Sequence, residues 1–136
     1  MDFFAYGSLI FEEVMTAVTG RKYSGLDARL EGFARYRVKD ESYPGIVASE
    51  HSFVDGFLYR RIDPTALSLL DRFEGEYYKR ESVEVTTGNA KEPAQAYIFR
   101  PEFSQLLTRE AWQKDVFKEH HLSGFLARYK GFTSRP

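Results

Sequence analysis

One acidic residue of the chain stands where a carboxylate could act in acid–base catalysis. Glu74 lies at the end of an apolar helical pattern, one residue after Phe73 and just before Gly75. Aromatic surroundings disfavour the charged form of a carboxylate, so its pKa rises and it can exchange protons near neutral pH. Spacing alone favours a simpler interpretation, in which residues 70–80 form a solvated, charged turn at a helix end. Its other charged residues are Asp71, Arg72, Glu76, Lys79 and Arg80.

A second segment, Tyr6-Gly7-Ser8-Leu9-Ile10, has the residue types of a backbone anion site. It follows a short apolar run and precedes a helical pattern. Backbone N–H groups at such a strand–turn–helix junction are free to bind an anion or a developing oxyanion. Gly7 lets a ligand approach the chain closely. By position alone, the simpler interpretation is a Gly-Ser turn with Tyr6 packed in the core.

Other kinds of site are excluded by what the chain lacks. It has no cysteine, which excludes a thiol nucleophile, a cysteine zinc site and disulfide bonds. The sequence contains no G-x-S-x-G elbow and no phosphate-binding, dinucleotide-binding or zinc-protease motif. His120 and His121 are neighbours on a predicted helix and point in different directions, and His51 follows Glu50 in a predicted turn. Since chelation from one helix face needs i, i+4 spacing, we expect no metal site.

The chain is balanced in charge and rich in aromatic residues. Its 19 Lys and Arg against 20 Asp and Glu give a net charge of −1, which argues against nucleic-acid binding. Its 12 Phe, 9 Tyr and 1 Trp make up 16% of the 136 residues, enough for a dense core or a ring-lined pocket. No run approaches the roughly 18 apolar residues of a membrane span, and the first residues lack a signal-peptide pattern. We expect one soluble, cytoplasmic domain over residues 1–136 with neither membrane nor nucleic-acid partners, and leave its oligomeric state open.

The order of the elements predicts an α+β domain with a curled antiparallel sheet. The clearest helix spans Pro64–Phe73. Asp63 is a natural N-cap, proline suits the first helical position, and Gly75 ends the apolar pattern. The other predicted helices are Phe11–Val18, which ends at Gly20, and roughly Thr108–Tyr129, which Gly124 interrupts. The predicted strands are Asp2–Tyr6, Phe33–Val38, Ile46–Ala48, Phe53–Tyr59, Ser82–Thr87 and Ala94–Arg100.

An ordered set of short motifs connects the two candidate segments. Tyr6-Gly7-Ser8-Leu9 stands near the N-terminus, and Leu70-Asp71-Arg72-Phe73-Glu74-Gly75 follows later, with Tyr78 and Arg80 behind it. Between them come Thr19-Gly20-Arg21, Ala28-Arg29-Leu30-Glu31-Gly32-Phe33, Tyr43-Pro44-Gly45-Ile46-Val47 and Val54-Asp55-Gly56-Phe57-Leu58-Tyr59. In this order and spacing they cover most of residues 2–100. The set resembles the γ-glutamylcyclotransferase-like family, in the short branch with avirulence-induced-protein-like (AIG2-like) and γ-glutamylamine cyclotransferase members.

The resemblance implies a fold, a reaction and a set of site residues. The implied fold is a small mixed or antiparallel β-barrel-like sheet with flanking helices and a pocket at one end. The implied reaction is the release of 5-oxoproline from a γ-glutamyl amine or related small γ-glutamyl amide, by a lyase- or acyltransferase-type cyclotransferase without metal or cofactor. Glu74 matches the catalytic carboxylate, as general base and then acid. Tyr6, Gly7, Ser8 and Leu9 match the segment that binds the γ-glutamyl group.

Further residues are expected around this pocket. Tyr78 is a candidate for lining it or for hydrogen-bonding the substrate, and a packing role fits it equally well. Arg35, Arg37 and Arg80 are candidates for binding the substrate's α-carboxylate, although arginines on strands usually face water. Residues after 100 are expected to shape the side of the pocket that faces the leaving amine. The rings expected around the two segments are Tyr6, Phe73, Tyr77 and Tyr78.

Two rival interpretations make different demands on the structure. A module that binds a small molecule or a partner without turnover would keep the same pocket, because fold does not guarantee function. A purely structural, aromatic-rich domain would leave Glu74 exposed and far from residues 7–9. For the enzyme, we expect the Glu74 carboxylate to lie in one cavity with the backbone of residues 7–9. The sequence does not name the amine.

Overall fold

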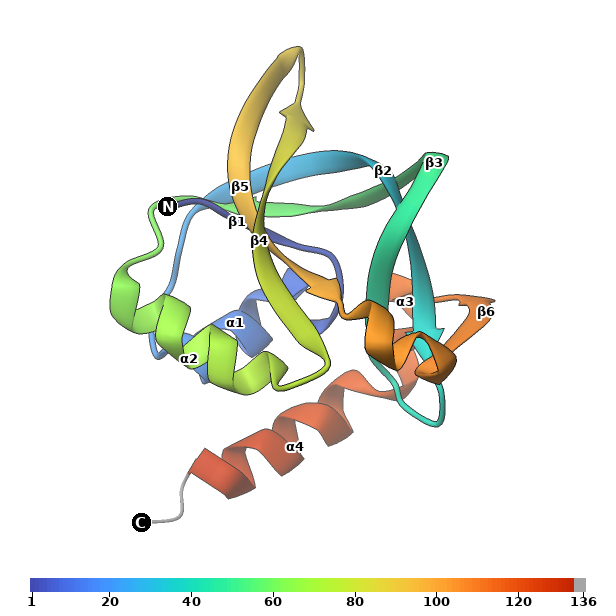
Figure 1. Cartoon of the computed structure of the whole chain (residues 1–136). Coiled ribbons are helices and arrows are strands. Elements are labelled where there is room, and N and C mark those ends of the chain that lie inside the picture. The colour runs from blue at the N-terminus through green and yellow to red at the C-terminus, as the bar shows by residue number, and fades with distance from the viewer. Residues whose placement is uncertain (134–136) are drawn as a thin grey trace.

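The computed structural model describes residues 1–133, and it describes side chains through residue 127. Figure 1 shows the strands curled around one another and the helices gathered at one end of them. The strands are β1 (Phe3–Ala5), β2 (Gly25–Val38), β3 (Pro44–Tyr59), β4 (Tyr78–Thr87), β5 (Ala90–Phe99) and β6 (Leu107–Ala111). The helices are α1 (Glu12–Thr19), α2 (Pro64–Glu74), α3 (Lys114–His120) and α4 (Leu122–Thr133), with 3-10 turns η1 (Ser8–Ile10) and η2 (Pro101–Leu106).

The sheet closes into a five-stranded barrel. Its strands follow the order β3-β1-β5-β4-β2, and β2 pairs back with β3 to complete the circle, while β6 attaches to β2 outside it. All neighbours are antiparallel except β1 and β5, which meet in parallel at Phe3 and Gln95. The predicted α+β class with a barrel-like mixed sheet and flanking helices is therefore confirmed. Among the described residues, no helix is long and apolar enough to span a membrane.

The strands β2 and β3 are longer than predicted. Each contains one residue whose backbone is in the left-handed conformation, and the strand continues past it. Gly32 has φ 84° and His51 has φ 71°. The pairing shifts register between Glu31 and Phe33, and residues 49–52 bulge out of β3 at the same level. His51 is thus part of an irregular strand and not of a turn between strands. Such bulges increase local bend and twist, which helps a sheet curl toward closure.

The predicted helix over Thr108–Tyr129 is wrong in its first part. Leu107–Ala111 forms β6, which pairs with Tyr36 and Val38 of β2. No local sequence pattern indicates this pairing. Two short helices follow instead of one long one. The break falls at His121, where the backbone leaves helical geometry, and Gly124 lies within α4 without interrupting it. Tertiary pairing overrides local propensity in this region.

The short strand β1 separates two hydrophobic cores. Its side chains alternate across the sheet, so Phe3 and Ala5 join the core between barrel and helices, and Phe4 joins the core inside the barrel. Leu30, Ile46, Val54, Leu58 and Val85 complete the inner core as its larger aliphatic members. Because β1 is buried on both faces, the loop that follows it starts from a rigid strand.

Helix α2 is built as the sequence predicts. The Asp63 side chain accepts a hydrogen bond from the Ala66 N–H at 2.7 Å, and Pro64 occupies the first turn. Leu67 and Leu70 turn into the core, and Gly75 ends the helix with φ 81°. Because Gly75 ends the helix, its last residue is Glu74, which lies beside the end of the barrel.

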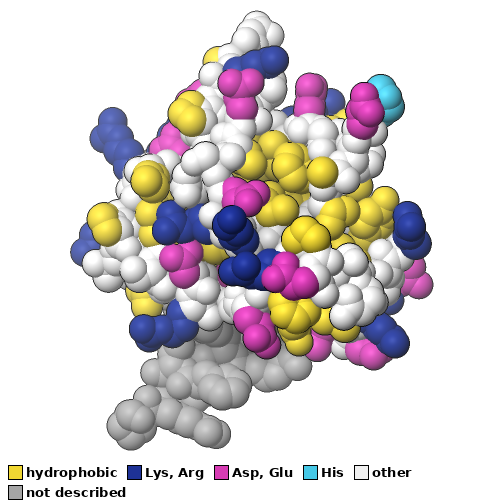
Figure 2. Space-filling view, viewed as in Figure 1, with side chains coloured by type: hydrophobic (Ala, Val, Ile, Leu, Met, Phe, Trp, Pro, Cys, Tyr) yellow, Lys and Arg dark blue, Asp and Glu magenta, His cyan; other side chains and the backbone are white. Residues whose placement is uncertain are grey.

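On the face seen in Figure 2, acidic and basic side chains are interspersed, and hydrophobic ones gather where the strands meet. This face presents no continuous basic surface. The distribution agrees with the balanced charge of the sequence.

Candidate active site

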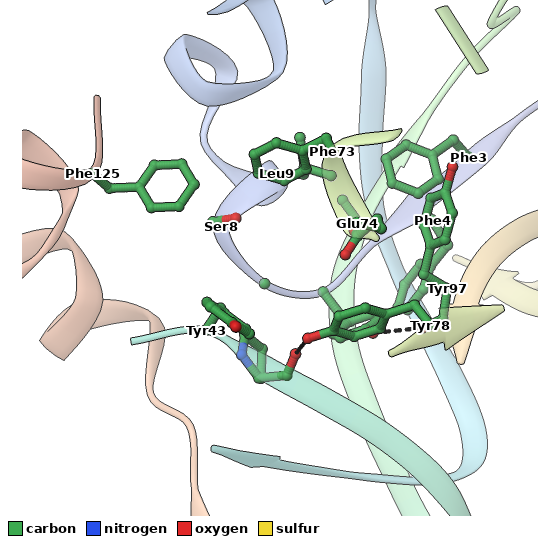
Figure 3. A pocket seen from close by; sticks show the side chains of 14 residues that line it. Phe3, Phe4, Ser8, Leu9, Tyr43, Phe73, Glu74, Tyr78, Tyr97 and Phe125 are labelled. Atoms are coloured by element: carbon green, nitrogen blue, oxygen red, sulfur yellow. Dashed lines mark hydrogen bonds between the residues drawn. The ribbon is translucent and has the colours of Figure 1, made fainter. Parts of the chain in front are cut away.

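A cavity of about 160 Å³ lies where β1, α2 and β4 come together (Figure 3). It contains both segments that the sequence singled out. The Glu74 side chain points into the same space that residues 7–9 enclose, whereas the purely structural interpretation required them to be far apart. Its lining among the described residues is Phe3, Phe4, Ala5, Tyr6, Gly7, Ser8, Leu9, Tyr43, Pro44, Phe73, Glu74, Tyr78, Tyr97 and Phe125.

The Glu74 carboxylate is held in apolar surroundings. It is half-buried at the end of α2, and no described residue donates a hydrogen bond to it. Removal from water disfavours its charged form, and burial raises its pKa from 4.5 to about 8. A carboxylate with such a pKa takes up and releases protons near neutral pH, as catalytic acids and bases do.

The loop after β1 lines this carboxylate's cavity and carries unpaired backbone donors. Gly7 leads into the short 3-10 turn η1, and the first amides of such a turn have no acceptor within it. Among the described residues, the N–H groups of Gly7, Ser8 and Leu9 make no turn or loop hydrogen bond. The Ser8 side chain is buried and caps nothing. These groups are free to meet a negatively charged ligand atom.

The loop is held in place by a chain of tight contacts to β3 and β4. The Tyr78 hydroxyl donates to the Pro44 carbonyl at 2.7 Å, and the pyrrolidine ring of Pro44 packs directly against Gly7. Burial raises the pKa of Tyr78 far above its ordinary value, so the hydroxyl stays protonated and keeps donating. Tyr78 thus lines the cavity, and its hydroxyl is bonded to the backbone.

Tyr97 joins the loop to the helix that carries Glu74. Its backbone carbonyl accepts a hydrogen bond of 2.5 Å from the Tyr6 hydroxyl. Its own hydroxyl donates to Asp71, one helical turn before Glu74, at 2.6 Å. Arg80 holds the same Asp71 carboxylate at 2.9 Å. The loop after β1 and the end of α2, which both line the cavity, are therefore connected through Tyr97 of β5.

The three arginines proposed for the substrate's α-carboxylate do not line the cavity. Arg35 donates to the Tyr6 carbonyl at 2.7 Å from outside, and burial lowers its pKa. Arg37 pairs with Glu110, and Arg80 pairs with Asp71 as described above. These side chains are occupied in holding the barrel and its loops. No described lining residue is a lysine or an arginine.

One ring expected at the cavity lies elsewhere, and several rings that line the cavity were not expected there. Tyr77 packs on Phe99 and Phe103 and does not line the cavity. Tyr43 and Pro44 belong to the motif Tyr43-Pro44-Gly45-Ile46-Val47, for which the sequence predicts no role at the site. Residues after 100 do reach the cavity, through Phe125 of α4. The missed wall residues, whose only sequence signal is the high aromatic content, are Phe3, Phe4, Tyr97 and Phe125.

Comparison with known proteins gives consistent matches over nearly the whole chain. Residues 3–114 match the family model described as gamma-glutamyl cyclotransferase, AIG2-like. AIG2-like protein C of Arabidopsis thaliana is 32% identical over 133 residues, which cover 96% of this chain and 77% of that protein. A solution structure of an Arabidopsis thaliana protein has a TM-score of 0.69 at 25% identity and covers 97% of this chain and 81% of that one. A solved gamma-glutamyl cyclotransferase shares the fold, with a TM-score of 0.67 at 16% identity over 95% of this chain and 85% of that one.

Proposed function

The chain belongs to the gamma-glutamyl cyclotransferase, AIG2-like family, and from that premise we propose that it releases 5-oxoproline from a γ-glutamyl amine or small γ-glutamyl amide. One observation carries the proposal. A carboxylate with a raised pKa lies in one small aromatic cavity with a loop whose backbone N–H groups are unpaired. An internal cyclisation needs a proton acceptor and oxyanion donors held around one folded substrate, and this arrangement supplies both.

The first step is removal of a proton from the substrate's α-ammonium group. The nitrogen cannot attack while it is protonated, and its pKa of roughly 8 or more lies close to that of Glu74. Transfer between groups of matched pKa costs little free energy. Ionised Glu74 takes the proton, and the nitrogen lone pair becomes available.

The freed nitrogen then attacks the substrate's own γ-carbonyl carbon. A new C–N bond forms, and the carbonyl oxygen takes the negative charge of a tetrahedral intermediate. The N–H groups of Gly7, Ser8 and Leu9 are the donors available to that oxygen. Such a donor contributes about 3 kcal/mol to the transition state when it is fixed in position.

Collapse of the intermediate completes the reaction without a water molecule. The carbonyl reforms, the original C–N bond breaks, and protonated Glu74 delivers its proton to the leaving nitrogen. The cyclised nitrogen still carries the second proton of the attacking amino group, and the ionised Glu74 carboxylate takes it up and passes it to the departing amine. The products are 5-oxoproline and the amine in its ammonium form, and Glu74 is ionised again. Because both reacting groups belong to one molecule, a cavity that folds the substrate supplies much of the rate enhancement.

The proposal is tested by offering the purified protein γ-glutamyl amines between pH 5.5 and 10 and measuring 5-oxoproline. The reactive pair is ionised Glu74 with a protonated substrate. We therefore expect kcat/KM to rise close to tenfold per pH unit up to about pH 7, level near pH 8, and fall above the pKa of the substrate's ammonium group. A profile that is flat between pH 5.5 and 7 would show that Glu74 ionises like an ordinary carboxyl. Binding of a γ-glutamyl amine without release of 5-oxoproline would favour a non-catalytic binding module.

Substitution of Gly7 by alanine is expected to disturb the loop donors. A Cβ at this position would lie 2.8 Å from Cδ and 2.9 Å from Cγ of Pro44, whose ring is stiff and whose carbonyl is held by Tyr78. The loop must shift, and displacement of positioned groups by about 1 Å costs on the order of 100-fold in rate. We expect Gly7→Ala to lower kcat/KM for 5-oxoproline release by about that factor.

The control for this substitution is Gly124→Ala in α4, where nothing lies within 4 Å of an added Cβ. It should leave kcat/KM within about twofold of the parent protein and should not lower the melting temperature. If Gly7→Ala releases 5-oxoproline as fast as Gly124→Ala, the loop amides do not take part in the reaction.

A further inference from the structure

One charged side chain holds the backbone of the loop after β1 from outside the cavity. The Arg35 guanidinium, on β2, donates from Nη1 to the Tyr6 carbonyl at 2.7 Å and to the Asp55 carbonyl at 3.1 Å. Arg35 does not line the cavity that contains Glu74, and it lines a separate, open groove beside β2 and β3. The Tyr6 carbonyl therefore points toward the side of the loop on which Arg35 lies.

The carbonyl of Tyr6 and the N–H of Gly7 belong to one peptide group. Within the described part of the chain no peptide bond is cis. In a trans peptide the C=O and the N–H point in opposite directions, so the Gly7 N–H points away from Arg35. Gly7 lines the cavity, and this N–H has no acceptor among the described residues. The bond that Arg35 makes on one side of the peptide thus fixes the direction of an unpaired donor on the other.

The charge of Arg35 is not shared with a carboxylate. Among the described residues it forms no ion pair, because the Asp55 carboxylate pairs with Arg29 at 2.8 Å. The guanidinium carbon lies 5.1 Å from the ring centroid of Trp112, which is buried. Arginine stays protonated in proteins, and hydrogen bonds from a charged donor are roughly twice as strong as neutral ones. The positive charge is therefore directed at the two backbone carbonyls.

A charged donor on the carbonyl strengthens the N–H at the other end of the peptide. The cation draws electron density from the peptide nitrogen, and hydrogen bonds in series strengthen one another by about 10–30% each. A backbone donor that is oriented before the reaction contributes most where negative charge develops in the transition state. In the proposed reaction this charge develops on the γ-carbonyl oxygen, and only after the nitrogen attacks.

We propose that Arg35 is a positioning residue, which orients and polarises the peptide between Tyr6 and Gly7 so that the Gly7 N–H donates to the oxyanion. This inference rests on the proposed cyclotransferase function and adds to it a side chain that does not touch the substrate. Because the oxyanion is absent from the bound substrate, loss of Arg35 should lower kcat and leave KM unchanged.

The first test measures 5-oxoproline release from a γ-glutamyl amine by the parent protein, Arg35→Met and Arg35→Lys. Methionine removes the charge, and we expect kcat to fall about tenfold while KM stays within about twofold. Both hydrogen bonds of Arg35 leave from one nitrogen, so a lysine ammonium can replace them. Arg35→Lys should keep more than about a third of the parent kcat.

The matched control is Arg37→Met, the same change two residues further along β2. Arg37 pairs with Glu110 and lines neither the cavity nor the groove. This variant loses an ion pair of the same strand, and it should keep the parent's kcat and KM. If Arg35→Met does not fold, Arg35→Lys and Arg35→Gln give the same comparison, since lysine keeps the charge and glutamine removes it.

The second test needs no substrate. The amide proton of Gly7 in proton–nitrogen correlation spectra reports on the polarisation of its peptide, because loss of electron density moves its resonance downfield. Arg35→Met should move the Gly7 resonance upfield by more than those of Ser8 and Leu9. Arg35→Lys should restore most of the difference, and Arg37→Met should leave the resonance in place.

The outcomes separate this inference from the proposed function. If the parent releases 5-oxoproline and Arg35→Met keeps its kcat, or raises KM with kcat unchanged, the role of Arg35 is wrong and the cyclotransferase stands. The same holds if Arg35→Lys is no more active than Arg35→Met, or if the Gly7 resonance does not respond. A parent protein that releases no 5-oxoproline overturns the cyclotransferase, and with it any part of Arg35 in that reaction.

Discussion

Replacement of Glu74 by glutamine is expected to lower 5-oxoproline release by about 1,000-fold or more. Glutamine keeps the shape of the side chain but can neither take the proton from the α-ammonium nor return one to the leaving amine. In the proposed reaction the general acid and the general base are the same group, so both proton transfers are lost at once, and each contributes typically 10²–10⁴-fold. The measurement is kcat for a γ-glutamyl amine at pH 8, with product detected as 5-oxoproline.

The matched control is Glu76→Gln, the same chemical change two residues further along. Glu76 is exposed and does not line the cavity, so this variant should keep the parent's kcat and KM. If Glu74→Gln retains more than a tenth of the parent activity, Glu74 is not the proton-transfer group. Substrate binding by the inactive variant, measured by calorimetry, would show that the cavity itself is intact.

The same Glu74→Gln variant is expected to be more stable than the parent at high pH. The folded protein holds the Glu74 proton up to about pH 8, whereas an unfolded chain releases it near 4.5. Below pH 4.5 both states are protonated and the group has no effect. As pH rises from 4.5 to 8 the unfolded state gains by ionising, so the parent loses stability, and above 8 the whole penalty is present. Glutamine does not ionise and avoids this loss.

The expected gain at pH 9 is on the order of 4 kcal/mol in the free energy of unfolding, and none is expected near pH 4. Urea unfolding of parent and variant at both pH values measures it. Glu76→Gln should match the parent at both, because that residue is exposed. A constant difference between parent and Glu74→Gln across this range would mean that the carboxyl is not shifted in the folded state.

Together these two results would show that the site is maintained at the expense of stability. A substitution that increases stability while it removes activity is typical of a functional group held in unfavourable surroundings. A carboxylate retained only for structure would be expected to have a hydrogen-bond partner, and among the described residues Glu74 has none. The pH dependence of stability thus gives a test of the site that needs no substrate.

Local sequence patterns predicted the elements whose signals are complete within a few residues. Asp63, Pro64 and Gly75 mark the ends of α2, and the structure shows the cap at each end. The lengths of β2 and β3 could not be predicted, because Gly32 resembles a strand end and proves to be a bulge. The strand β6 could not be predicted either, since its residues have no strand pattern and its pairing with β2 is set by the closed barrel.

At the site, the sequence indicated the two segments for which a chemical role is proposed, but not the walls between them. Glu74 and residues 6–9 were singled out by residue type, and the ordered set of motifs, rather than spacing alone, favoured a role for them. Tyr97 and Phe125 come from elements far along the chain, and only the fold brings them to the cavity. The arginines were misjudged for a related reason. Arg35 is used by the backbone carbonyl of Tyr6, and no local pattern reveals such a bond.

The position of β1 has a consequence for the order in which the protein folds. The pairs β2–β3 and β4–β5 are neighbours along the chain, so each can form early as a local hairpin. Strand β1 spans only Phe3–Ala5 and is held between β3 and β5, which follow it by about 50 and 90 residues. We therefore expect it to insert late, after both hairpins have formed. Since the loop amides follow β1 directly, we expect the side of the cavity formed by residues 6–9 to close around Glu74 only at that last step.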